Sequence, residues 1–205
     1  MDEFLQSVYL REVQAQSKMA MNAAGAFDHL QRIDEENRDN PNYDSELHIM
    51  ESFRTLHSFL THLSNVSRLV WPPSFAKPRC ACKKHKLELG SCYSCRASSR
   101  AFILQQMLEV VGVEHILKNR ELRDHLEHFD ERLDEWRFTS KNRIIVSNYF
   151  GPEGGICVPD NSDIMRGYDP ANGDFTFRGE KYSVVDLYKG VEDILIRINR
   201  TGLLR

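Results

Sequence analysis

The stretch NRELRDHLEHFDERLDEWR, residues 119–137, has the most regular amphipathic pattern of the chain. Its apolar residues recur at alternating spacings of four and three, which is the period of one face of an α-helix. Asn119 is a residue type that caps helix N-termini. The stretch therefore predicts one continuous helix whose core-facing residues are Leu122, Leu126, Phe129, Leu133 and Trp136.

Three further helices are expected upstream of this stretch. Residues 2–36 contain no Pro and have a helical apolar spacing, and residues 44–70 have another before Trp71-Pro72-Pro73 ends it. Residues 98–111 form a shorter helix that Gly112 ends. Together these helices predict an antiparallel bundle over residues 1–138, interrupted by an irregular, Cys-rich and basic loop at 72–96.

The last third of the chain has a different character. Residues 144–149 and 175–177 are predicted strands, and residues 169–173 are a turn between them. Ser183 followed by Asp186 is typical of a capping box that opens a final helix. We therefore expect a mainly α protein, a helical bundle with a small C-terminal β-hairpin and helix appendage at 139–205.

Composition and charge narrow the classes of protein. The net charge is −3, so a contact with nucleic acid has to come from a local basic patch. No apolar run approaches the ~20 residues that cross a bilayer. The N-terminus is acidic and lacks the basic-then-apolar pattern of a secretory signal. We expect a cytoplasmic protein with no membrane partner.

Polar side chains with useful chemistry interrupt the amphipathic stretch. The guanidinium of Arg123 offers a planar fork of donors that suits a phosphate. His128 titrates near neutral pH and can serve as a general acid or base. Asp124 lies four residues before His128, a spacing at which a carboxylate can orient an imidazole.

The segment RDHLEH, residues 123–128, resembles the HEPN signature of an Arg, four to six residues of which the first is polar, and a His. The resemblance implies a metal-independent endoribonuclease, a toxin or antiviral effector in which the ribose 2′-hydroxyl attacks the neighbouring phosphate. It implies that His128 moves the proton and Arg123 holds the phosphate, without a catalytic cofactor, and that an antitoxin or regulatory protein is a partner. Asp124 stands where Asn is frequent, and Asp130 stands where members modified on tyrosine carry Tyr.

The expected helix geometry indicates that a site with both Arg123 and His128 needs two copies of the chain. At about 100° per residue, Arg123 and His128 fall roughly 100° and 120° to opposite sides of the apolar stripe. One straight helix holds them apart, whereas two helices across a two-fold axis bring Arg123 of one near His128 of the other. We predict a homodimer with composite sites, which His125 and Arg132 join from the His128 flank.

A plainer interpretation stays open beside this one. Charged residues that flank an apolar stripe are usually a solvated face, and Arg123 with Glu127 forms an ordinary i,i+4 pair. The alternative function is a non-catalytic HEPN-like binding or regulatory module, stabilised by zinc.

Four of the five cysteines form two close pairs, Cys80 with Cys82 and Cys92 with Cys95. Thiolates at such spacings can surround a structural Zn²⁺, and four of them close the site to a zinc-dependent reaction. Reduced thiols in a loop and a redox role for the second pair are the alternatives. Cys157 stands alone and is expected to be buried.

The same loop holds the strongest basic concentration of the chain. It includes Lys77, Arg79, Lys83, Lys84 and Lys86, with Arg96 and Arg100 just beyond. We assign RNA-backbone contacts to Lys83, Lys84, Lys86 and Arg96, and to Arg132 on the amphipathic stretch. A solvated loop without a ligand is the alternative.

Overall fold

The computed structural model describes residues 3–37, 39–73, 80–119 and 121–204. They form a mainly helical chain with a small sheet towards the C-terminus, which confirms the predicted class at this level. Contacts divide the chain into two compact units, each built from separate segments. Unit 1 comprises Met1–Asn22, Phe59–Lys118 and Gly190–Arg205, and unit 2 comprises Ala23–Ser58 and Asn119–Lys189. Each unit thus takes residues from both sides of position 138, where we expected a domain boundary.

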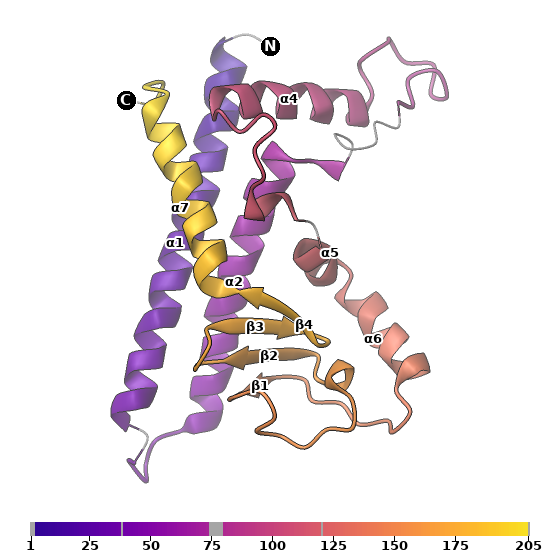
Figure 1. Ribbon diagram of the computed structural model, residues 1–205. Coiled ribbons are helices and arrows are strands. Elements are labelled where there is room, and N and C mark those ends of the chain that lie inside the picture. The colour runs from indigo at the N-terminus through magenta and orange to yellow at the C-terminus, as the bar shows by residue number, and fades with distance from the viewer. Residues whose placement is uncertain (1–2, 38, 74–79, 120, 205) are drawn as a thin grey trace. The chain divides into compact units, whose positions relative to one another are not determined.

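Two long helices, α1 (Glu3–Asn37) and α2 (Ser45–Val70), contribute to both units. In unit 1, the amide oxygen of Gln16 on α1 lies 2.8 Å from Nδ1 of His62 and accepts from Nδ2 of Asn65 on α2. In unit 2, Gln31 of α1 contacts Ser52 of α2. Early residues of α1 therefore pair with late residues of α2, so the helices are antiparallel, as the sequence predicts (Figure 1).

Unit 1 also contains α4 (Tyr93–Met107), the short 3₁₀ turn Ile116–Lys118 and most of α7 (Val184–Arg200). Helix α4 begins five residues before the expected start at 98. It ends before Gly112 because Glu109 already adopts a positive φ of 54°. The carboxamide of Gln105, which is buried, donates to the carbonyl of Val70 at 2.8 Å and so ties α4 to the end of α2. The buried apolar residues of this unit include Leu10, Val13, Phe59, Leu60, Leu104, Leu108, Ile194 and Ile198.

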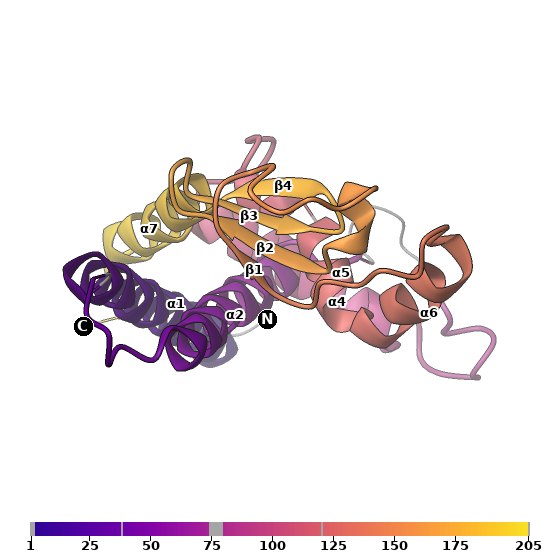
Figure 2. The ribbon, with the colours of Figure 1, turned by 90° about the horizontal axis from the view of Figure 1, so that it is seen from below.

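Unit 2 holds a four-stranded sheet in the order β1-β2-β3-β4 (Figure 2). The strands are β1 (Tyr149–Phe150), β2 (Arg166–Asp169), β3 (Asp174–Phe177) and β4 (Glu180–Ser183). β1 is parallel to β2, and the other neighbours are antiparallel. The expected strand at 144–149 is thus mostly irregular, with one bridge from Val146 to Ile164, and β2 was not predicted.

The sheet and the final helix are joined as the sequence indicates. The hydroxyl of Ser183 accepts a hydrogen bond from the backbone N–H of Asp186 at 3.2 Å, so Ser183 caps the first turn of α7. In unit 2, Phe27 of α1 meets Tyr168 of β2 edge to face, with ring centroids 4.8 Å apart. The buried apolar residues of this unit include Phe53, Leu56, Met165, Phe175, Phe177 and Leu187.

Candidate functional site

The expected continuous helix over 119–137 is wrong, because the chain forms two helices that meet at His128. These are α5 (Glu121–Glu127) and α6 (Phe129–Thr139). His128 has φ −115° and ψ 40°, outside the α-helical region, which redirects the chain between the helices. Leu122 on α5 is buried, whereas α6 has no buried residue, so the apolar stripe is not one core face. The indole N–H of Trp136 instead donates to a carboxylate oxygen of buried Asp163 at 3.1 Å.

Arg123 lies inside the protein rather than on an accessible flank of the helix. The residue is only 2% exposed. Its Nε lies 3.6 Å from a carboxylate oxygen of Asp124 and 3.5 Å from one of Glu127. The i,i+4 pair with Glu127 is the plainer arrangement that the sequence left open. In this conformation the guanidinium does not present its fork of donors to a phosphate in solvent.

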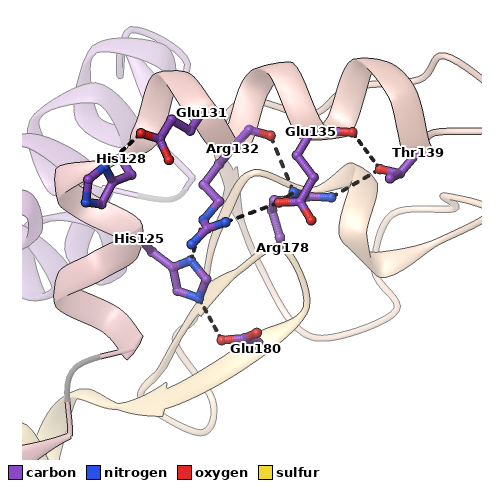
Figure 3. Close-up of polar contacts among 8 residues, drawn as sticks. All are labelled: His125, His128, Glu131, Arg132, Glu135, Thr139, Arg178 and Glu180. Atoms are coloured by element: carbon purple, nitrogen blue, oxygen red, sulfur yellow. Dashed lines mark hydrogen bonds and ion pairs between the residues drawn. The ribbon is translucent and has the colours of Figure 1, made fainter. Parts of the chain in front are cut away.

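His128 is the more exposed of the two histidines of this segment. Its side chain is 49% exposed, and its Nδ1 lies 3.1 Å from a carboxylate oxygen of Glu131 (Figure 3). A carboxylate at Nδ1 favours the tautomer with the proton on that nitrogen, which leaves Nε2 with its lone pair. Asp124, the residue we expected to orient His128, contacts Arg123 instead.

His125 sits in a different environment, with partners on both ring nitrogens (Figure 3). Its Nδ1 accepts a hydrogen bond from Nε of Arg132 at 3.2 Å, and its Nε2 lies 2.7 Å from a carboxylate oxygen of Glu180. The ring also stacks on Phe177, with centroids 4.8 Å apart and planes 13° apart. These contacts anchor α5 to the sheet of unit 2 and occupy the nitrogens that acid–base catalysis would need.

The polar network continues along α6 through groups that the sequence did not single out. Arg178 donates to a carboxylate oxygen of Glu135 at 2.7 Å and to Oγ1 of Thr139 at 3.4 Å (Figure 3). Arg132 also reaches Glu135, at 3.3 Å. Because these partners are up to 43 residues apart, no local spacing reveals them. The guanidinium of Arg132, which is partly exposed, thus already has His125 and Glu135 as partners.

The four clustered cysteines come together in unit 1. Ligand atoms of Cys80, Cys82, Cys92 and Cys95 all lie within 4.8 Å of one another, so they could hold a metal ion. The loop turns tightly around them: the backbone N–H of Leu87 donates to the carbonyl of Cys82, and that of Cys92 donates to Sγ of Cys82 at 3.4 Å. Cys157 is exposed, contrary to our expectation, and lies in unit 2.

The thiols of this cluster have strongly unequal acidities. Backbone N–H groups of Cys95 and Ala81 bond to the sulfur of Cys92 and lower its pKa to about 6. The neighbouring sulfur of Cys92 raises the pKa of Cys95 to about 12. The four thiols therefore cannot all ionise at neutral pH by themselves, and a bound dication would supply the missing compensation.

The basic residues assigned to RNA divide between the two units. Lys83, Lys84 and Lys86 are exposed on the cysteine loop of unit 1, Arg96 is exposed on α4 of the same unit, and Arg132 belongs to unit 2. Lys77 and Arg79 lie outside the described residues. Arg100 points back to the carbonyls of Arg68 and Leu69, at 3.3 and 3.4 Å.

A small cavity of about 50 Å³ lies at the sheet of unit 2. Its lining includes Tyr149, Tyr168, Glu153, Asp169 and Lys181. Three of its charged side chains already have polar partners: Lys181 bonds Glu153 at 2.6 Å, and Asp169 accepts from the backbone N–H groups of Glu153 and Ala171.

Among the described residues, no helix has the length and apolar character required to span a membrane. Comparisons of the chain with family models, with curated proteins and with solved structures return no match.

Proposed function

We propose that the protein is a metal-independent endoribonuclease of the HEPN type in which His128 transfers the proton. The observation that carries this proposal is the pairing of Glu131 with Nδ1 of His128 at 3.1 Å on a half-exposed imidazole. The carboxylate orients the ring and leaves Nε2 as the nitrogen that can accept a proton from a substrate. This arrangement supplies the ring orientation that a general base requires.

Cleavage of RNA by the ribose 2′-hydroxyl needs one group that first accepts a proton and later donates it. Nε2 of His128 removes the proton of a ribose 2′-hydroxyl, whose oxygen attacks the neighbouring phosphorus. The P–O bond to the 5′-oxygen of the next nucleotide breaks, and the imidazolium returns its proton to that oxygen. The products are a 2′,3′-cyclic phosphate and a free 5′-hydroxyl, with no net change in protons and no metal.

Arg123 takes a positioning role within this proposal. Its buried guanidinium contacts the carboxylates of Asp124 and Glu127 on the helix that ends just before His128. It thereby holds the last turn of α5 in place. The composite site of a homodimer stays a prediction, and it requires Arg123 of one copy to leave these carboxylates before it can contact a phosphate. The antitoxin or regulatory partner likewise remains a proposal.

Cleavage of a labelled single-stranded RNA tests the proposal. We expect full activity in EDTA, loss of at least a hundredfold in His128→Ala, and a smaller loss in Glu131→Gln, because Gln keeps a contact with the ring but not its charge. His29→Ala removes another exposed histidine and serves as the matched control. Unchanged cleavage in His128→Ala, or loss of cleavage in EDTA under conditions that keep the protein folded, overturns the mechanism.

The cysteine cluster favours a second candidate, a non-catalytic binding module stabilised by zinc. Four sulfur ligands around one point fit Zn²⁺ in a closed structural site, and N–H groups directed at the sulfurs stabilise bound thiolates. We propose Zn²⁺ as the ion under either function. A clean preparation that binds RNA but cleaves none at any pH from 5 to 9 would favour the binding module.

A further inference from the structure

The cysteine loop concentrates positive charge at the surface of an otherwise acidic chain. Three exposed cations, Lys83, Lys84 and Lys86, follow Cys82, and a fourth, Arg96, lies in the first turn of α4. Glu88 is the one acidic residue between Cys82 and Arg96. The whole chain, by contrast, carries a net charge of −3. Such a local patch attracts a polyanion that the rest of the molecule repels.

Large apolar side chains are exposed beside these cations. Leu89, in the loop before the buried Cys92, is 80% exposed, and Tyr93, which follows Cys92 and begins α4, is 73% exposed. An exposed aromatic ring beside lysines offers a stacking face next to positive charge, which fits a ligand with flat apolar surfaces and negative charge. Nucleobases joined by phosphates have both properties.

The cysteine cluster brings the chain segments that carry these groups close together. The sulfurs of Cys82 and Cys92 belong to one group within 4.8 Å, and Lys83 and Tyr93 are the residues that follow them. A bound Zn²⁺ with four thiolates carries two negative charges, but Cys82 and Cys92 are buried while the cations are exposed. Tyr93 also begins α4, whose first turn contains Arg96 and no acidic residue.

We infer that the cysteine loop is a binding surface for single-stranded RNA, with Tyr93 stacking on an unpaired base and Lys83, Lys84 and Lys86 contacting the backbone. The inference rests on the proposed function in taking RNA as the ligand, and it adds the requirement for unpaired bases. Bases inside a duplex are stacked on one another, so they offer no face to Tyr93.

Fluorescence anisotropy of the full chain tests this surface, with a labelled 20-nucleotide oligouridine and a 20-base-pair RNA duplex as probes. All variants carry His128→Ala, so that RNA is not cleaved. We expect tighter binding of the single strand, about tenfold weaker binding in Tyr93→Ala, and near-normal binding in Tyr93→Phe, which keeps the ring. The triple change of Lys83, Lys84 and Lys86 to Ala should weaken binding and reduce the slope of log Kobs against the logarithm of the salt concentration by about 2.

The matched control changes Lys18, Lys141 and Lys189 to Ala, which alters the net charge equally through exposed lysines elsewhere. The inference is overturned if this control weakens binding as much as the loop variant, if Tyr93→Ala binds normally, or if the duplex binds as tightly as the single strand. The inference is also overturned if the protein binds vesicles containing phosphatidylserine as tightly as it binds the single-stranded RNA, and if this binding depends on the same lysines and Tyr93. That result would favour an anionic membrane as the ligand. This experiment tests RNA binding separately from the proposed cleavage, because all of its variants carry His128→Ala.

Discussion

Nε2 of His125 and a carboxylate oxygen of Glu180 lie 2.7 Å apart, and this contact joins α5 to β4 within unit 2. Arg132 donates to the other ring nitrogen, so the imidazole proton resides on Nε2 and is donated to Glu180. His125, which precedes His128 by three residues, therefore serves as a structural link between α5 and β4.

The first prediction separates the two histidines by stability. We expect His125→Ala to lower the free energy of unfolding by about 2–3 kcal/mol, because it removes a hydrogen bond with a charged partner and the stacking on Phe177. His128→Ala should change it by less than about 0.5 kcal/mol, since that side chain is half exposed. Urea unfolding followed by circular dichroism measures both. Equal effects of the two variants would contradict the assignment of different roles.

The second prediction concerns the dependence of stability on pH through Glu180. The hydrogen bond from His125 lowers the pKa of Glu180 in the folded protein, so the ionised carboxylate favours folding. This stabilisation is present above the ordinary glutamate pKa of about 4.5. It is lost as the pH falls through the lower, folded value. The stability difference between the wild type and Glu180→Gln should therefore be largest near pH 6 and shrink towards pH 3. A difference that stays constant over this range would show that the Glu180 charge does not contribute.

Much of the helical framework could be predicted because its signals are local. Apolar spacing placed α1 and α2 to within a few residues, and Ser183 caps α7 at the expected position. The break at His128 has no such signal, because the apolar stripe continues across it. The buried contacts of Leu122 and the hydrogen bond from Trp136 to Asp163, a residue 27 positions away, compete with that stripe.

The candidate site could be predicted only in part, because some of its contacts join residues that are far apart in the sequence. The four cysteines were recognisable as one group from their spacing, and the structure brings them together. The burial of Arg123 and the partners of His125 and Arg132 depend on which segments pack together. Strand β2 was missed because Arg-Gly-Tyr-Asp lacks the alternation of a half-buried strand and instead pairs on both sides.

The third prediction tests the packing of this missed strand. Gly167 of β2 lies opposite Thr176 of β3, and a Cβ on Gly167 would come within 2.3 Å of Oγ1 of Thr176. Gly167→Ala should therefore lower the free energy of unfolding by about 1–3 kcal/mol. Adding Thr176→Ala removes the obstructing oxygen and should restore part of the loss. If the double variant is destabilised by the sum of the two single changes, measured by urea unfolding, this steric contact is not the cause.

The fourth prediction concerns metal in the cysteine cluster. We expect one Zn²⁺ per chain by mass spectrometry of the native protein, and loss of this metal in Cys92→Ser, because Cys92 is one of four sulfurs that lie within 4.8 Å of one another. Cys157→Ser is the matched control, since this exposed thiol lies outside the cluster, and it should retain the metal. Because thiolates are the ligands, protons compete with Zn²⁺, and zinc affinity should fall as the pH is lowered from 8 to 5.

Removing the metal should lower the melting temperature of the native protein but leave that of Cys92→Ser unchanged. A wild-type protein that holds no Zn²⁺ after purification without chelator, and whose melting temperature ignores added Zn²⁺, would leave the loop to be stabilised by its backbone turns and Sγ hydrogen bonds alone.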